Sequence, residues 1–302
     1  MPHSILALST RESRRVAASR VVSLQYLLRR KLGLAGAAIL VVIAGAAVVG
    51  PGLIPHNPYV QDIEARLKPP GYAVAGSALS VLGTDQLGRD ILARILQGAR
   101  VSIAIAFCAV VLSAALGTGL GLAAGYYGAF LDVVVMRLAD LQMAFPFILL
   151  SLAILGALGP SIVNMIVVFV VTGWPVYART IRGSLLTLKH GTLVESALAI
   201  GLPEWRILST YILLTCLDPL IVLASFEVGR VILLESSLSF LGLGIQPPTP
   251  SWGNMVADGR DYISTAWWLI TFPGLALMLT VFSVNAVGDV LREYLDPKQR
   301  RS

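Results

Sequence analysis

Three stretches of this chain are long, apolar and free of charged side chains, and they constrain its fold more than any other feature. They are Leu32–Ile54, Val101–Leu131 and Leu141–Ala178. A helix needs about 20 mostly apolar residues to cross a lipid bilayer, so each stretch is long enough. Only 13% of the 302 residues are charged, about half the share found in soluble domains. We therefore expect an all-α integral membrane protein.

The stretch Leu141–Ala178 is too long for one helix, and the pair Gly159 and Pro160 lies near its middle. Proline disrupts a continuing helix and disfavours helical geometry in the residue before it. We expect this pair to separate a third transmembrane span from a fourth.

Two further spans are expected nearer the C-terminus. The fifth runs from about Tyr211 to Leu234, and the sixth lies within Tyr262–Gly288. Trp267 and Trp268, near the start of the sixth, are expected to be anchors at the membrane interface. The total is about six transmembrane helices, an even number that places both termini on the same side.

Basic residues indicate which side that is, because positive charge beside membrane spans stays in the cytoplasm. The residues before the first span include Arg11, Arg14, Arg15, Arg20, Arg29, Arg30 and Lys31. Both termini and the basic loop Arg179–Thr210 are therefore expected in the cytoplasm. The stretch Ser236–Asp261 is expected outside it.

The expected organisation has three parts. Residues 1–98 hold an amphipathic N-terminal helix, the first transmembrane helix and an extracytoplasmic loop. Residues 99–295 hold a core of five transmembrane helices. Residues 296–302 form a cytoplasmic tail.

The sequence lacks the motifs of common nucleotide-dependent and hydrolytic enzymes. None of the four lysines follows a glycine, which excludes the phosphate-binding loop G-x-x-x-x-G-K-[ST]. There is no H-E-x-x-H zinc motif, and no serine lies in G-x-S-x-G. Gly117, Gly119 and Gly121 follow no strand, so close helix packing explains them better than a dinucleotide site. We expect no catalytic residue, no metal site and no cofactor bound by this chain.

Span five has charged residues within it or beside it: Asp218, Glu227, Arg230 and Glu235. A charge at the bilayer centre costs roughly 2.5–3.5 kcal/mol on insertion scales, so these side chains should face protein or water. Glu227 and Arg230 are three residues apart and can pair on one helix face. They are either a buried structural pair or candidates for the lining of a wet translocation path.

The cytoplasmic segment between spans four and five has the pattern of two short helices with a break. Residues Glu195–Leu198 favour a helix, Gly201 can end it, and Pro203 favours the start of a second helix. Such an elbow, with an apolar tip at Leu202 and Trp205, suits a groove on another protein; the alternative is a surface-lying connector. The candidate docking residues are Glu195, Ser196, Ala197, Gly201, Leu202, Pro203, Glu204 and Trp205.

The chain resembles a known transporter family along nearly all its length. Glu195-Ser196-Ala197 followed by Gly201 is similar to the EAA loop of binding-protein-dependent ABC importer permeases. More specifically, the chain resembles the C-type permeases of the dipeptide, oligopeptide and nickel transporters. The motifs that carry this resemblance are Leu82–Asp85 with Gly88–Asp90, Ser237–Pro250 with Trp252-Gly253, and Asp296-Pro297.

The resemblance implies a type I ABC importer permease fold in a bacterial inner membrane. It implies that the chain forms half of a translocation pathway for di- or oligopeptides. The implied partners are a second, homologous permease, two ATP-binding subunits and an extracytoplasmic substrate-binding protein. ATP and Mg²⁺ would bind to the ATP-binding subunits, which would dock on the elbow as their coupling helix.

Several alternatives to this function stay open. The same machinery imports nickel or glutathione-like solutes, and the charges of span five also suit an ion-coupled secondary transporter. The loop Leu241–Trp252 either receives the binding protein, roofs the pathway or caps the bundle. Two departures from the family pattern are Ser196 at the second alanine of the triplet and Leu213-Leu214 where a Leu-Pro is usual.

Overall fold

The structure is a computed structural model. It describes residues 31–52, 56–73, 79–189, 191, 194, 196, 199, 201–203 and 206–295. The expected amphipathic N-terminal helix, the tail 296–302 and the motif Asp296-Pro297 lie outside the described residues.

Long helices build the molecule, as the apolar runs predict. In order they are the first helix Lys31–Gly52, α2 (Ile91–Tyr127), α3 (Ala129–Ala144), α4 (Phe147–Leu158), α5 (Ile162–Leu188), α8 (Leu213–Phe240), α9 (Trp252–Gly259) and α10 (Trp268–Leu295). Short one-turn helices are η1 (Ile63–Ala65) and η3 (Arg260–Tyr262), and η2 (Ile207–Ile212) is a π-helical start to α8. Strands β1 (Tyr72–Ala73) and β2 (Leu79–Ser80) pair antiparallel, Tyr72 opposite Ser80.

Four helices of the described chain are long and apolar enough to cross a membrane: the first helix, α2, α5 and α10. The bent pair of α3 and α4 counts as a fifth. Helix α8 has 28 residues, which is long enough, but it carries the charged residues of span five. The all-α membrane fold is confirmed, and α8 would bring the spans to the expected six.

The expected boundaries of spans two to four were wrong in places. Helix α2 begins at Ile91, capped by the Asp90 carboxylate on the backbone N–H of Ala93 at 2.8 Å, so the preceding loop is shorter than expected. Helix α5 continues to Leu188, which places Arg179 and Arg182 on a helix instead of in a loop. Hydropathy marks the part of a helix at lipid depth, whereas hydrogen bonds and caps decide where the helix ends.

The third span also differs from the expectation. Helix α4 has only 12 residues, about 18 Å, which is too short to cross a bilayer alone. It is joined to α3 through Phe145 and Pro146, where the chain bends by 93°. Pro146 therefore separates α3 from α4. The expected pair Gly159 and Pro160 separates α4 from α5.

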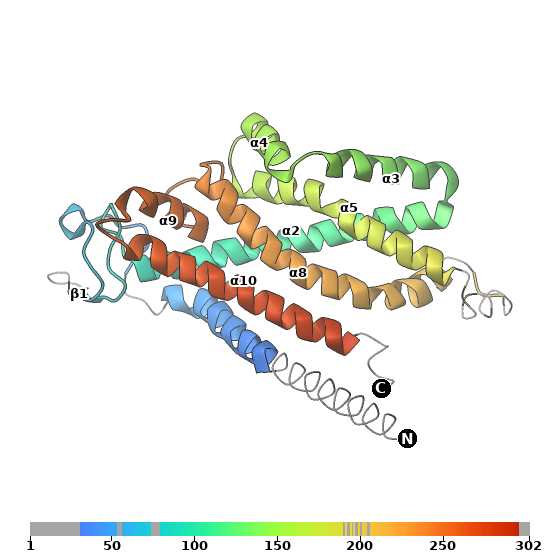
Figure 1. Ribbon diagram of the computed structural model, residues 1–302, viewed down its shortest axis with the longest axis horizontal. Coiled ribbons are helices and arrows are strands. Elements are labelled where there is room, and N and C mark those ends of the chain that lie inside the picture. The colour runs from blue at the N-terminus through green and yellow to red at the C-terminus, as the bar shows by residue number, and fades with distance from the viewer. Residues whose placement is uncertain are drawn as a thin grey trace, which may run out of the picture.

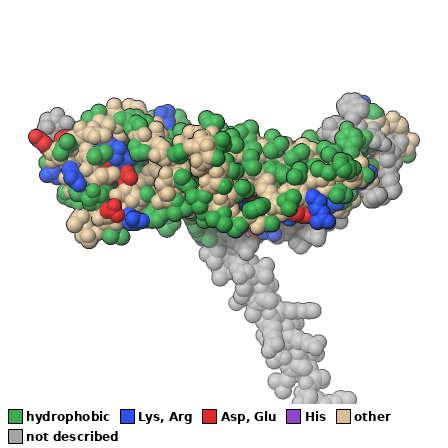
Figure 2. All heavy atoms as spheres, turned by 90° about the horizontal axis from the view of Figure 1, so that it is seen from above, with side chains coloured by type: hydrophobic (Ala, Val, Ile, Leu, Met, Phe, Trp, Pro, Cys, Tyr) green, Lys and Arg blue, Asp and Glu red, His purple; other side chains and the backbone are tan. Residues whose placement is uncertain are grey.

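The helices form a long bundle whose two ends differ (Figure 1). Helices α5, α8 and α10 pack against or beside α2, while α3 and α4 lie along the outside of α5. We call the end with α9 and the β1–β2 hairpin the cap end, and the end where α5 finishes the elbow end. Apolar side chains cover the middle of the face formed by α3, α4 and α5, as a lipid- or partner-facing surface requires (Figure 2).

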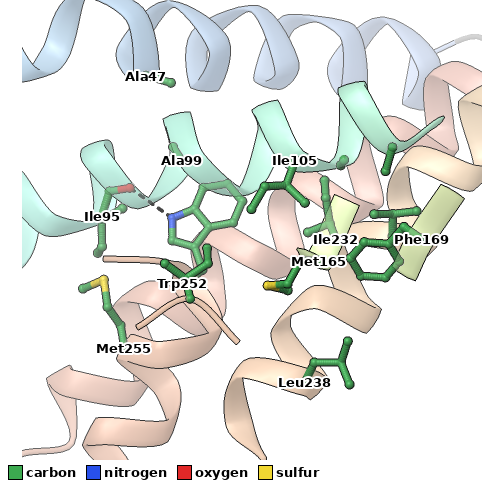
Figure 3. Packing of buried hydrophobic residues seen from close by; sticks show 14 of the residues in the cluster. Ala47, Ile95, Ala99, Ile105, Met165, Phe169, Ile232, Leu238, Trp252 and Met255 are labelled. Carbon is green, nitrogen blue, oxygen red and sulfur yellow. Dashed lines mark hydrogen bonds between the residues drawn. The ribbon is translucent and has the colours of Figure 1, made fainter. Parts of the chain in front are cut away.

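The main core lies toward the cap end, between α2, α5, α8, α9 and α10. Trp252 is almost fully buried, and its indole N–H donates to the carbonyl oxygen of Ile95 at 3.0 Å (Figure 3). Trp268 is also buried and donates to the carbonyl oxygen of Thr84 at 3.1 Å. The expectation of an interface anchor was therefore wrong for Trp268, whose indole is used inside the protein; Trp267 is exposed.

Buried ion pairs hold the cap together. Arg89 Nε lies 2.7 Å from Asp85 Oδ2, and Arg94 pairs with the same carboxylate. Arg94 Nη2 also lies 3.8 Å from Asp258 Oδ2, next to η3. These pairs join the Leu82–Asp90 motif to the start of α2 and to the end of α9. A buried charge left without its partner is strongly destabilising, so the motif has a structural reason to contain these residue types.

Two glycines bring α2 and α5 into backbone contact. A β-carbon at Gly117 would collide with the carbonyl oxygen of Trp174 and with Tyr177. One at Gly121 would collide with the backbone of Ala178, whereas Gly119 has open space around its α-carbon. The expected close helix packing is confirmed for Gly117 and Gly121.

We predict that Gly121→Val destabilises the protein by about 1–3 kcal/mol, because valine would push α5 away from α2. The matched control is Gly119→Val, which adds the same side chain two residues away, where a β-carbon meets no atom within 4 Å. Thermal unfolding of the purified protein in detergent measures the difference. Equal melting temperatures for the two variants would show that the α2–α5 approach does not matter for stability.

Candidate functional site: the elbow and the charged pair

The elbow follows the end of α5, and the structure describes part of it. The backbone is helical at Val194, Ser196 and Ala199, and Gly201 has a φ of +77°. This left-handed conformation is open to glycine at no cost and disfavoured for other residues. After it, the N–H groups of Arg206 and Ile207 donate to the carbonyl oxygen of Pro203 at 2.9 and 3.2 Å. At the described positions the chain is thus helical, breaks at glycine and becomes helical again.

The exposure of the elbow differs in part from the expectation. Ser196, Ala199, Gly201 and Pro203 are exposed, so small residues form its described outer surface. Leu202, expected at an apolar tip, is half-buried and packs on an apolar cluster of its own chain. The other expected docking residues, Glu195, Ala197, Glu204 and Trp205, lie outside the described residues.

The apolar cluster beneath the elbow connects it to the membrane helices. It joins Val194 to residues of α5, η2 and α8, and Leu202 packs against it. Its buried members are Tyr177, Ile181, Leu185, Val194, Ile207, Ile212, Cys216 and Leu220. The described elbow residues Val194 and Leu202 are therefore in packing contact with side chains of α5 and α8.

Glu227 and Arg230 pair on α8, as their spacing predicts. Arg230 Nε donates to Glu227 Oε2 at 2.9 Å, and Arg230 Nη2 donates to the same oxygen at 2.6 Å. The Glu227 side chain is only 12% exposed, while that of Arg230 is 41% exposed. A guanidinium exposed halfway along a membrane helix is costly against lipid, so this face of α8 needs protein or water beside it.

Tyr177 of α5 is a third member of this region that the sequence did not single out. Its side chain is fully buried, and its hydroxyl has no hydrogen-bond partner in the described part of the chain. It lies within electrostatic range of Glu227 and Arg230. No sequence signal distinguishes it, because a tyrosine in an apolar helix usually packs with its hydroxyl satisfied.

Glu235 lies apart from that pair in a cage of hydroxyl groups. It is fully buried, with Ser239 donating to Oε1 at 2.8 Å and Ser102 of α2 donating to Oε2 at 3.2 Å. These bonds tie α8 to α2 near the cap end. Glu235 therefore faces the protein interior and not a translocation path. Asp218, on the same helix, is exposed.

No group of three or more His, Cys, Asp or Glu side chains that could hold a metal ion occurs among the described residues. The described residues offer small exposed side chains in the elbow, prolines inside α5, α8 and α10, and a half-exposed ion pair. These features suit the movement of a solute and the docking of a partner more than bond chemistry.

Two family models match the chain. Residues 117–301 match the binding-protein-dependent transport system inner membrane component. Residues 22–70 match the N-terminal TM domain of oligopeptide transport permease C. The first match covers more than half of the chain and therefore shows the family.

Curated relatives are similar over most of their length. The di/tripeptide transport system permease protein DppC of Pseudomonas aeruginosa is 39% identical over 272 residues, covering 90% of each chain. The dipeptide transport system permease protein DppC of Haemophilus influenzae is 37% identical, covering 91% of this chain and 94% of the relative. The glutathione transport system permease protein GsiD of Pectobacterium atrosepticum is 43% identical over 217 residues, which is 72% of each chain.

Solved structures share the fold. Two inward-facing structures of the MetNI methionine ABC transporter match with TM-scores of 0.53 and 0.54 at 18% and 19% identity. In both, the match covers 67% of this chain and 96% of the other. The fold is that of a type I ABC importer permease. This chain belongs to the inner-membrane permease subunits of binding-protein-dependent ABC importers, among the peptide-transport permeases, and is itself no enzyme.

Proposed function

We propose that this chain forms half of the translocation pathway of an ATP-driven importer and pairs with a homologous second permease. Two ATP-binding subunits, which hold ATP and Mg²⁺, dock on the elbow around Gly201. An extracytoplasmic binding protein delivers substrate at the cap end, and both termini lie in the cytoplasm. The observation that carries the proposal is the elbow itself, whose small exposed residues follow directly from α5 and rest on the cluster shared with α8.

The mechanism is a population shift between two pore states. Closure of the ATP-binding subunits would displace the elbow, and the cluster beneath it would carry the displacement into α5 and α8. A partner can shift such an equilibrium only by as much as it binds one state better than the other. Prolines inside the helices, Pro175 in α5, Pro219 in α8 and Pro273 in α10, remove backbone bonds and permit the helices to bend.

The proposed substrates are di- and oligopeptides, because the relatives named for di- and tripeptides cover most of this chain. The glutathione relative supports the wider class of peptide-like solutes. Nickel is the alternative cargo of this kind of permease.

We further propose that Glu227 and Arg230 line the pathway. The half-exposed guanidinium needs a wet or protein surface, and a pore shared with a second permease supplies one. Tyr177 supports this assignment, because its buried hydroxyl finds no hydrogen-bond partner among the described residues, which is costly. A second pore state in which this hydroxyl pairs with Glu227 or Arg230 would relieve that cost.

We predict that Gly201→Val reduces ATP-dependent uptake by about tenfold. A side chain in the left-handed conformation costs about 1–2 kcal/mol. This cost disfavours the backbone conformation of the elbow by a factor of about ten. The control is Gly183→Val on α5, where a new β-carbon also meets no atom within 4 Å but the backbone is helical. Uptake and ATP hydrolysis of the assembled transporter are both measured. Equal uptake by the two variants would contradict the docking role.

We predict different outcomes for single and double substitutions of the charged pair. Glu227→Leu leaves Arg230 without its carboxylate and should destabilise the protein by roughly 1–3 kcal/mol. The double variant Glu227→Leu with Arg230→Leu removes both charges and should regain thermal stability. If the pair lines the pathway, the double variant stays stable and assembled but does not transport peptide. Normal uptake by the double variant would show that the pair has only a structural role and does not line the pathway.

A further inference from the structure

A charged hollow lies between α3 and α5 near the elbow end. Its volume is about 510 Å³. Figure 2 shows charged side chains beside the apolar surface over these helices. The lining residues are Asp132, Val133, Met136, Arg137, Asp140, Arg179 and Arg182.

The hollow carries an excess of positive charge. Arg182 donates from Nε and Nη2 to Asp132, and Arg179 pairs with Asp140, so each carboxylate already has an arginine. Arg137 is exposed and makes no ion pair or hydrogen bond with the described part of the chain. The Arg179 and Arg182 side chains are 40% and 33% exposed, and each guanidinium has further N–H donors to offer. Three arginines against two aspartates leave one positive charge to be met by an anion.

The hollow lies at the depth of lipid headgroups. Helix α5 has no charged residue from Ile162 to Ala178, a length of about 26 Å that nearly matches the hydrocarbon core of a bilayer. Arg179 follows at the boundary, and Arg182 lies one turn beyond it. Arg182 pairs with Asp132, which places this part of α3 at the same level.

The lining also has an apolar side. Val133 and Met136 face the hollow, and Leu138 and Leu141 are exposed on the same helix. An acidic segment of a protein would use the arginines but has no need of apolar surface at this depth. A phospholipid needs both, because its phosphate lies directly above its acyl chains.

We propose that this hollow binds the phosphate headgroup of an anionic phospholipid in the leaflet at the elbow end. Arg137 and the free N–H groups of Arg179 and Arg182 donate to the phosphate oxygens, and guanidinium is well suited to such planar, multiple bonding. Val133 and Met136 contact the glycerol and the upper acyl chain. Basic pockets at the cytoplasmic side of membrane helices bind anionic headgroups in this way. The lipid would join α3 to the part of α5 that leads into the elbow.

The test uses the purified full-length transporter in vesicles of phosphatidylcholine with phosphatidylglycerol, followed by native mass spectrometry of the lipids that stay bound. We expect wild type to retain phosphatidylglycerol in preference to phosphatidylcholine. Arg137→Gln should bind it about fivefold more weakly, the effect of one basic residue near an anionic surface. Arg137→Lys keeps the charge but loses the planar set of N–H donors, so its affinity should lie between those of wild type and Arg137→Gln. The matched control Arg292→Gln removes one charge from the last turn of α10, outside the hollow, and should bind as wild type does.

Several results would overturn the proposal. Equal retention by Arg137→Gln and Arg292→Gln would show that the hollow holds no lipid. Displacement of phosphatidylglycerol by millimolar inorganic phosphate would show a site for free phosphate instead of a lipid headgroup. A cross-linker at position 137 that captures a partner subunit in place of lipid would show that protein covers the hollow. Because Arg137 is exposed and without a partner in the described chain, its substitution should leave the melting temperature unchanged.

Discussion

The backbone contact between α2 and α5 at Gly117 and Gly121 joins the two ends of the molecule. Helix α2 carries the ion-paired cap at its first turns, and α5 leads into the elbow at its last. Because glycine has no side chain to separate them, the two helices approach each other at backbone distance here. In lipid, helix association relies on such close packing, since the hydrophobic effect does not drive one helix onto another.

The second constraint is that charged side chains in a membrane protein need partners or water, and the structure meets this need in three ways. At the cap, Asp85, Arg89 and Arg94 pair in a buried network. Glu235 is enclosed by hydroxyl groups of α2 and α8. Glu227 and Arg230 pair with each other, but the guanidinium stays accessible. The first two arrangements are complete among the described residues, whereas the half-exposed guanidinium of Arg230 requires water or a partner surface, which a translocation pathway would provide.

Much of the fold could be predicted from the sequence, because long apolar runs have few solutions in a membrane. The ends of the helices could not, since lipid depth and helix length are different quantities. Asp90 is a typical N-cap and could have indicated the start of α2 at Ile91, and Pro146 could have indicated the bend between α3 and α4. The Glu227–Arg230 pair followed from spacing alone. The environment of Tyr177, the burial of Trp268 and the inward packing of Leu202 depend on contacts between distant segments and leave no local signal.

ATP-driven import of peptides can be measured as uptake in cells of the source bacterium that lack this chain. Labelled dipeptide and labelled nickel are supplied to deletion cells with and without the restored chain, while either ATP or the ion gradients are depleted. We expect the restored chain to return dipeptide uptake but not nickel uptake, and we expect this uptake to continue with ATP present when the ion gradients are collapsed. Loss of dipeptide uptake when the ion gradients are collapsed and ATP is maintained would contradict ATP-driven import and indicate an ion-coupled transporter.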